Sequence, residues 1–151
     1  MTRFIAFDPG GVTGVARYAP DGAVPFASYE VANGAPGMFA SLSRGEGGWL
    51  GEYGLVIIES FTINAATHRK DPAGVHAALN IIGALQYECT RHRVPFVLRS
   101  PSGAKAFATD DKLRKVGWWN PSVGGHANDA ARHLLTWLTK NRHEEILNAL
   151  R

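Results

Sequence analysis

The sequence predicts an α/β fold in which helices flank a mixed five-stranded sheet, and three observations support it. The first 31 residues hold three short apolar runs separated by turn residues, which is typical of an antiparallel meander. Two later apolar runs, at residues 54–59 and 95–99, alternate with helical patterns, which is typical of parallel strands joined by helices. The 151 residues contain no internal repeat and no linker, so we expect a single domain over residues 1–151.

The expected meander begins with a buried strand at residues 4–7, which stops at the turn sequence Asp8-Pro9-Gly10-Gly11. A second strand is expected over residues 12–18, and the turn sequence Pro20-Asp21-Gly22 leads into a third over residues 24–31. Because short turns join neighbouring strands of opposite direction, these three strands are expected to pair antiparallel.

The rest of the chain alternates helices with strands. Residues 54–59 form a continuous, β-branched run, which indicates a central strand covered on both faces. In the long helix that follows, Val75, Leu79 and Ile82 recur at helical spacing and are expected to share one apolar face. The other expected elements are a weak helix within residues 35–50, a polar connection over 60–72, the long helix over 74–93, a strand over 95–99, a polar helical segment over 102–116, a loop over 117–125 and a closing helix whose apolar face extends over 127–138.

Composition excludes several classes of protein. Hydrophobic residues make up 45% of the chain and charged residues 19%, as in a soluble globular protein. No apolar run approaches the ~20 residues that cross a bilayer, and the first eight residues are too short and too quickly charged for a signal peptide. The only cysteine, Cys89, excludes an intramolecular disulfide and a cysteine-built zinc site. We therefore expect a cytoplasmic protein without a membrane partner. The net charge of +3 is compatible with a polyanionic partner but does not identify one.

Acidic residues stand where two of the expected strands end. Asp8 ends the first strand and Glu59 ends the central one. Because ligands of open α/β sheets bind at the carboxyl ends of the strands, these two carboxylates are expected to converge. On the closing helix, His126, Asp129 and His133 are spaced i, i+3 and i+7 and share one face. We expect Asp129 to lie in the first turn of that helix, where the helix dipole favours a negative charge.

Three carboxylates and an imidazole at one sheet edge predict a metal site. Each acid alone is better explained as a strand end, a turn or a helix cap; only the combination favours metal binding. An oxygen-rich set with one nitrogen suits Mg²⁺, with Mn²⁺ as the alternative. Two ions about 4 Å apart would clamp a phosphodiester for hydrolysis. We expect Asp8 to bridge them, Glu59 to complete one shell and Asp129 with His126 to complete the other, while His133 is an orienting or core residue.

These motifs resemble the RuvC-type Holliday-junction resolvases, especially their bacteriophage-encoded branch. The resemblance rests on Phe7-Asp8-Pro9-Gly10 with Thr13-Gly14, on Val56-Ile57-Ile58-Glu59 and on His126-x-x-Asp129-Ala130, and it covers residues 4–138. It implies a ribonuclease H-like fold, a homodimer, and paired nicks across a four-way DNA junction in a bacterium or a phage-infected cell. It also implies that Asp8, Glu59, His126 and Asp129 are the metal ligands. His126 departs from the aspartate that many relatives carry, which bears on metal preference.

A second set of side chains is expected to contact DNA. The segment 60–70 directly follows Glu59 and combines an aromatic residue with basic ones, which suits base stacking and phosphate contacts. The resemblance implies that this segment reaches the junction centre. Phe61 is equally explained as a core residue, and the basic run around residue 114 as a solvated helix face. The predicted DNA-contacting residues are Phe61, Arg69, Lys70, Lys105, Lys112 and Lys115, and one of the three last lysines could stabilise the transition state.

Three other functions were weighed. The sequence Asp8-Pro9-Gly10-Gly11-Val12-Thr13-Gly14 also resembles the first phosphate loop of actin-like ATPases and sugar kinases, but those proteins need a second similar domain for which 151 residues leave no room. A junction-binding protein without catalytic activity would be expected to lack one of the acids, and none is missing. An RNA-processing nuclease of the same superfamily stays open as the principal alternative.

Overall fold

The computed structural model describes residues 2–46, 50–121 and 124–151, and it confirms the mixed five-stranded sheet. Residues 47–49 of the expected weak helix and residues 122–123 of the expected loop lie outside the described residues. The strands are β1 (Phe4–Asp8), β2 (Thr13–Tyr18), β3 (Phe26–Val31), β4 (Leu55–Glu59) and β5 (Phe96–Arg99). Their order is β3-β2-β1-β4-β5, with β3, β2 and β1 antiparallel and β1, β4 and β5 parallel.

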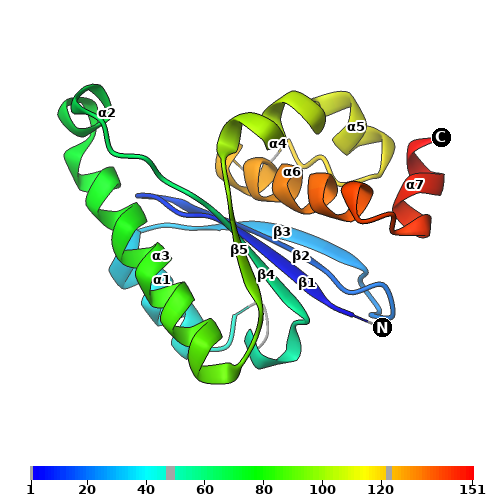
Figure 1. Ribbon diagram of the computed structural model, residues 1–151, viewed down its shortest axis with the longest axis horizontal. Coiled ribbons are helices and arrows are strands. Elements are labelled where there is room, and N and C mark those ends of the chain that lie inside the picture. The colour runs from blue at the N-terminus through cyan, green and yellow to red at the C-terminus, as the bar shows by residue number, and fades with distance from the viewer. Residues whose placement is uncertain (1, 47–49, 122–123) are drawn as a thin grey trace.

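Helices cover both faces of this sheet, as Figure 1 shows. One layer contains α1 (Gly34–Ser43), the short helix η1 (Leu50–Glu52) and the long α3 (Pro72–His92), with α2 (Ala65–Lys70) at the N-terminal end of α3. The other layer contains α4 (Pro101–Phe107), α5 (Asp110–Lys115), α6 (Gly125–Lys140) and α7 (Glu144–Leu150). Within the described parts of the chain, no helix is long and apolar enough to span a bilayer.

Alternating side chains of the central strands divide the core into two clusters. In β1, Phe4 and Ala6 belong to the cluster under α6, while Ile5 and Phe7 belong to the cluster under α1 and α3. β4 alternates in the same way, with Ile57 on the α6 side. Because successive side chains of a strand point to opposite faces, the last residue of each strand also falls on the α6 side. The strand pattern therefore directs both terminal carboxylates toward α6.

The structure shows which apolar stripe of α3 faces the sheet. Its buried side chains are Val75, Ala78, Ile81, Leu85 and Cys89, whereas Leu79 is 37% exposed. Val75 and Leu79, which were expected to share one apolar face, are therefore not buried together. The helix carries two adjacent apolar stripes, and periodicity alone cannot tell which one the sheet covers.

Three helical features also differ from expectation. The polar segment 102–116 is two helices, because α4 ends at Phe107 and Thr109 caps α5 by accepting a hydrogen bond from the Lys112 amide. The polar connection contains α2, which begins with a reciprocal cap between Asn64 and Thr67. A further helix, α7, follows the closing one and is anchored by the Tyr18 hydroxyl, which donates to Glu145 at 2.8 Å. Side-chain caps mark the starts of α2 and α5, whereas α7 has no side-chain cap and is held by the contact with Tyr18.

The N-terminus of α6 lies directly on β2. A Cβ atom added to Gly14 would lie 1.8 Å from the carbonyl oxygen of His126, far inside any allowed contact. Only glycine therefore permits the helix to approach the strand this closely. The contact fixes where the first turns of α6 stand relative to the ends of β1 and β4.

We predict that Gly14→Ala lowers the free energy of unfolding by about 1–3 kcal/mol, because the helix must move away from the strand. Urea denaturation followed by circular dichroism measures the change. Gly83→Ala is the matched control: nothing lies within 4 Å of a Cβ at Gly83 within α3, so this change should stabilise the protein by about 0.5–1 kcal/mol. Equal stabilities for Gly14→Ala and the wild type would show that α6 does not depend on this contact.

Candidate active site

Two of the predicted acids, Asp8 and Glu59, belong to one row of residues that crosses the sheet. Asp8 pairs with Gly14 of β2, and Gly14 pairs with Glu30 of β3. On the other side, Phe7 pairs with Ile58, so Asp8 is next in register to Glu59 of β4. The row Glu30–Gly14–Asp8–Glu59 lies under the first half of α6. The sheet register thus brings together two acids that are 51 positions apart in the chain.

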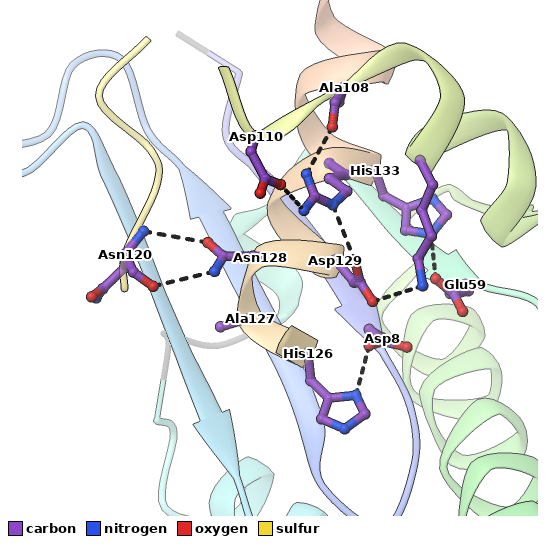
Figure 2. Close-up of polar contacts among 12 residues, drawn as sticks. Asp8, Glu59, Ala108, Asp110, Asn120, His126, Ala127, Asn128, Asp129 and His133 are labelled. Carbon is purple, nitrogen blue, oxygen red and sulfur yellow. Dashed lines mark hydrogen bonds and ion pairs between the residues drawn. The ribbon is translucent and has the colours of Figure 1, made fainter. Parts of the chain in front are cut away.

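Asp8 is the most buried of these acids, with 7% of its surface exposed. Its Oδ2 lies 2.9 Å from Nδ1 of His126 at the start of α6. Burial raises the pKa of Asp8 to about 6, the negative charge of Glu59 and more weakly that of Asp129 add to the rise, and the His126 contact opposes it. Figure 2 shows Asp8, Glu59 and Asp129 facing one another. The acids therefore repel one another, and a cation among them would be stabilised.

Glu59 is held by a buried histidine. Nε2 of His133 lies 2.6 Å from Oε2 of Glu59, and the His133 side chain is 2% exposed (Figure 2). His133 stands two helical turns after His126, so the same face of α6 contacts both strand ends. A buried imidazole in this position fixes the orientation of the carboxylate, which agrees with the orienting role expected for His133.

Asp129 lies in the second turn of α6, because the helix begins at Gly125. The expectation that Asp129 lies in the first turn, where the helix dipole favours a negative charge, was wrong. Its Oδ2 lies 3.0 Å from Nζ of Lys105 on α4, and its Oδ1 accepts a hydrogen bond from Nε of Arg132 at 3.2 Å. The hydrogen bond with Asp129 raises the pKa of Lys105. Asp129 is therefore held between two cationic side chains.

Glu30 occupies the place at the helix N-terminus that the sequence assigned to Asp129. The N-cap residue, Gly124, makes no side-chain cap, and Oε1 of Glu30 instead accepts hydrogen bonds from the amides of His126 at 3.1 Å and Ala127 at 3.4 Å. A carboxylate is favoured there by the helix dipole and by the free amides of the first turn. Glu30 thus fixes the backbone of His126 from the neighbouring strand.

A cleft of about 570 Å³ contains the predicted metal ligands and part of the predicted DNA surface. Phe61 is half-buried, belongs to neither core cluster, and lines this cleft, so its alternative assignment to the core is not supported. The predicted site residues that line the cleft are Asp8, Glu59, His126, Asp129, Phe61, Lys70 and Lys105.

The other predicted DNA-contacting residues lie outside the lining of this cleft and contact backbone carbonyls. Nε of Arg69 donates to Ala65 within α2, at 3.1 Å. Nζ of Lys112 donates to the carbonyl of Phe107 at 2.9 Å, and Nζ of Lys115 donates to that of Leu150 at 2.8 Å. Of the three lysines considered for transition-state stabilisation, Lys105 alone lines the cleft with the acids.

The cluster fits a divalent cation by chemistry, although its side chains are engaged with one another. Among the described residues, no group of three or more His, Cys, Asp or Glu side chains already stands in a metal-holding arrangement. Each predicted ligand contacts a neighbouring side chain: His126 with Asp8, His133 with Glu59, Lys105 with Asp129. Carboxylate oxygens with one imidazole suit Mg²⁺ or Mn²⁺. Burial raises the pKa of Asp8 and the negative charge of Glu59 adds to the rise, so a cation in the cleft would favour the charged carboxylates.

Sequence reasoning missed two residues of the site. Glu30 carries no local signal, since only the pairing of β2 with β3 places it beside α6. Arg132 does carry a local signal, because it follows Asp129 by three positions on a helix, and side chains at that spacing are neighbours on the helix surface.

Comparison with known proteins places the fold. No protein-family model matches the chain, and no curated protein matches it in sequence. Among solved structures, the chain resembles Thermus thermophilus RuvC in complex with a Holliday junction substrate, with a TM-score of 0.63 and 18% identity over 95% of this chain and 97% of that one. A second T. thermophilus RuvC structure gives a TM-score of 0.56 at 16% identity, over 94% of this chain and 96% of the other. The chain therefore has the ribonuclease H-like fold of RuvC.

The raised pKa of Asp8 predicts a pH-dependent stability in the absence of metal. Between the ordinary value of 3.8 and about 6, the unfolded chain loses the Asp8 proton while the folded protein keeps it, so stability falls as pH rises through this window. Asp8→Asn keeps the shape of the neutral acid and should remove this loss. In EDTA, urea denaturation should find Asp8→Asn more stable than the wild type at pH 7, by on the order of 2 kcal/mol, with the difference shrinking toward pH 4. A difference that is constant over this range would contradict the assignment.

Proposed function

We propose that the protein is a metal-dependent endonuclease that hydrolyses phosphodiester bonds of branched DNA, with the four-way junction as its main substrate. The observation that carries the proposal is the convergence of Asp8, Glu59 and Asp129 in one cleft at the carboxyl ends of β1 and β4. The fold that holds them is shared with T. thermophilus RuvC, whose solved complex contains a Holliday junction substrate. Kinship with the bacteriophage-encoded branch of that family, and a place in the cytoplasm of a bacterium or an infected cell, are part of the same proposal.

In this proposal Asp8, Glu59, Asp129 and His126 hold the metal. When bound, a pair of Mg²⁺ or Mn²⁺ ions supplies an activated water and charge stabilisation for the leaving oxygen. The chain's own residues prepare the site. His133 keeps the Glu59 carboxylate turned toward the cleft, and Glu30 fixes the backbone that carries His126. Lys105 lines the cleft beside Asp129, where its positive charge would attract the phosphate of the substrate.

The substrate would lie across the cleft between α6 and the start of α3. Phe61 and Lys70 line the wall opposite α6, where an aromatic ring suits stacking on an unpaired base and a lysine suits a phosphate. Arg69, Lys112 and Lys115, which lie outside the cleft lining, would contact more distant phosphates. At the centre of a junction the continuous stacking of the duplex is interrupted, so the face of a base there can meet an aromatic ring, and this arrangement favours branched DNA over a continuous duplex.

Two other functions share parts of this argument. An RNA-processing nuclease of the same fold would use the same metal chemistry, and the cleft alone does not distinguish RNA from DNA. The T. thermophilus complex with a junction substrate favours DNA. A junction-binding protein without activity is less well supported, because all four candidate ligands are present and line one cleft.

We also propose that the protein acts as a homodimer. Two opposed nicks across a junction with approximate two-fold symmetry call for two copies of a single active site. The layer of α1 and α3 offers a surface for the contact, because Phe39, Leu79 and Tyr87 are 40%, 37% and 65% exposed there. Phe39 and Tyr87 also line a cavity of about 500 Å³ between these helices.

Removing single carboxylates tests the nuclease. Asp8→Asn, Glu59→Gln and Asp129→Asn should each reduce cleavage of a four-way junction in Mg²⁺ by more than about 100-fold, because several kcal/mol of transition-state stabilisation depend on the metal. Junction binding should persist or tighten, since less negative charge faces the phosphates. Cleavage is measured on labelled four-way DNA, linear duplex and RNA.

The matched control is Asp111→Asn, which removes the same charge from a side chain that is 93% exposed on α5 and outside the cleft lining. It should cleave at the wild-type rate. Near wild-type cleavage by Asp8→Asn would reject the proposed site, and preferential cleavage of RNA would favour the alternative nuclease.

Mixing experiments test the dimer. Wild-type chains mixed with Asp8→Asn chains should produce heterodimers that nick a junction only once, alongside fully resolved products from wild-type pairs. The products are separated on denaturing gels. A monomer at micromolar concentration in light scattering, with and without junction, would contradict paired nicking.

A further inference from the structure

Arg132 links Asp129 to the segment between α4 and α5. Its Nε donates to Oδ1 of Asp129 at 3.2 Å, and one terminal nitrogen donates to the carbonyl of Ala108 at 2.8 Å. The other terminal nitrogen donates to Oδ1 of Asp110. The Arg132 side chain is 14% exposed, and its guanidinium lies 5.9 Å from the centre of the Trp119 ring. All three nitrogens of the guanidinium are thus engaged in a partly buried position.

This arrangement distinguishes the two oxygens of Asp129. Oδ1 is tied to Arg132, whereas Oδ2 contacts only the flexible, 56% exposed side chain of Lys105 among the described residues. Asp129 also lines the cleft. A carboxylate with one oxygen fixed by a planar guanidinium cannot turn freely, so its second oxygen keeps one direction.

The other contacts of Arg132 fix the segment that carries Lys105. Ala108 is the C-cap of α4, and Asp110 is the first residue of α5, so Arg132 holds the junction of the two helices. Figure 2 shows Ala108 and Asp110 on the side of Asp129 away from Asp8. One side chain therefore sets the position of Asp129 and, through α4, of the lysine that contacts it.

We propose that Arg132 is a positioning residue of the active site, which fixes Oδ1 of Asp129 so that Oδ2 is presented to the metal, and which holds α4 so that Lys105 stays at the cleft. The inference rests on the proposed function, because it needs a metal at Asp129. The simpler explanation is an ion pair that only joins helices α5 and α6. The two explanations differ in one measurable quantity, the affinity of the folded protein for the metal.

The test measures Mn²⁺ binding to the DNA-free protein by isothermal titration calorimetry, with thermal melting in EDTA as the measure of folding. Arg132→Gln should weaken Mn²⁺ binding about 10-fold or more, as loss of a residue that orients a ligand does. Arg132→Lys keeps the charge but lacks the planar fork, so it should restore little of the affinity.

Arg114→Gln is the matched control. Arg114 forms ion pairs with Asp110 and Asp111 and lies 4.7 Å from the centre of the Trp119 ring, so the change removes the same charge from a neighbouring, more exposed position. The Mn²⁺ affinity of Arg114→Gln should stay within about 2-fold of the wild type, because Arg114 has no ion pair with Asp129 among the described residues. Asp110→Asn loosens Arg132 without removing it and should give an intermediate loss of affinity.

The outcomes separate the inference from the proposed function. A folded Arg132→Gln protein with wild-type Mn²⁺ affinity would overturn the positioning role while leaving the nuclease intact. If Arg132→Gln does not fold, wild-type affinity in Asp110→Asn would overturn it in the same way. A wild-type protein that binds no Mn²⁺ and cleaves no junction would overturn the proposed function and the inference together.

Discussion

The close contact between the N-terminus of α6 and β2 is the constraint on which the site depends. Gly14 allows the helix backbone to reach the strand, and Glu30 holds the amides of its first turn from the adjacent strand. With the start of the helix fixed, its 3.6-residue period places His126 over Asp8 and His133 over Glu59. The positions of these side chains are therefore set by backbone packing at a residue that bears no side chain.

Electrostatics impose the second constraint. Carboxylates at the ends of two adjacent strands repel one another in a partly buried cleft, and burial together with the negative charge of Glu59 raises the pKa of Asp8. Cationic side chains offset part of this charge, because Lys105 and Arg132 both contact Asp129. Contacts of this kind stabilise the folded protein and leave the acids in place for a stronger cation.

The sequence was sufficient to predict the sheet and the convergence of the acids, because both follow from local patterns. Asp8 and Glu59 stand at strand ends, and the i, i+3, i+7 spacing places His126, Asp129 and His133 on one helix face. What could not be predicted depends on pairing between distant segments. The role of Glu30 follows from its register with Gly14, and the orientation of α3 from which of two apolar stripes the sheet covers. Local spacing did indicate the pair formed by Asp129 and Arg132. Its link to the segment between α4 and α5 depends on contacts of Arg132 with Ala108 and Asp110, which the sequence does not show.

The spread of the site along the chain has a consequence for how the protein folds. Its acids come from β1, β4 and α6, at positions 8, 59 and 129, so the unfolded chain holds them far apart and has no preformed affinity for a divalent ion. An ion that binds the assembled cluster therefore binds the native state almost exclusively, and its binding free energy adds to the free energy of unfolding. Contacts between such distant positions require long loops to close, which costs chain entropy. We therefore expect the cluster to assemble late in folding. In the proposed nuclease, activity would then arise only in molecules that have completed the sheet and docked α6 on it.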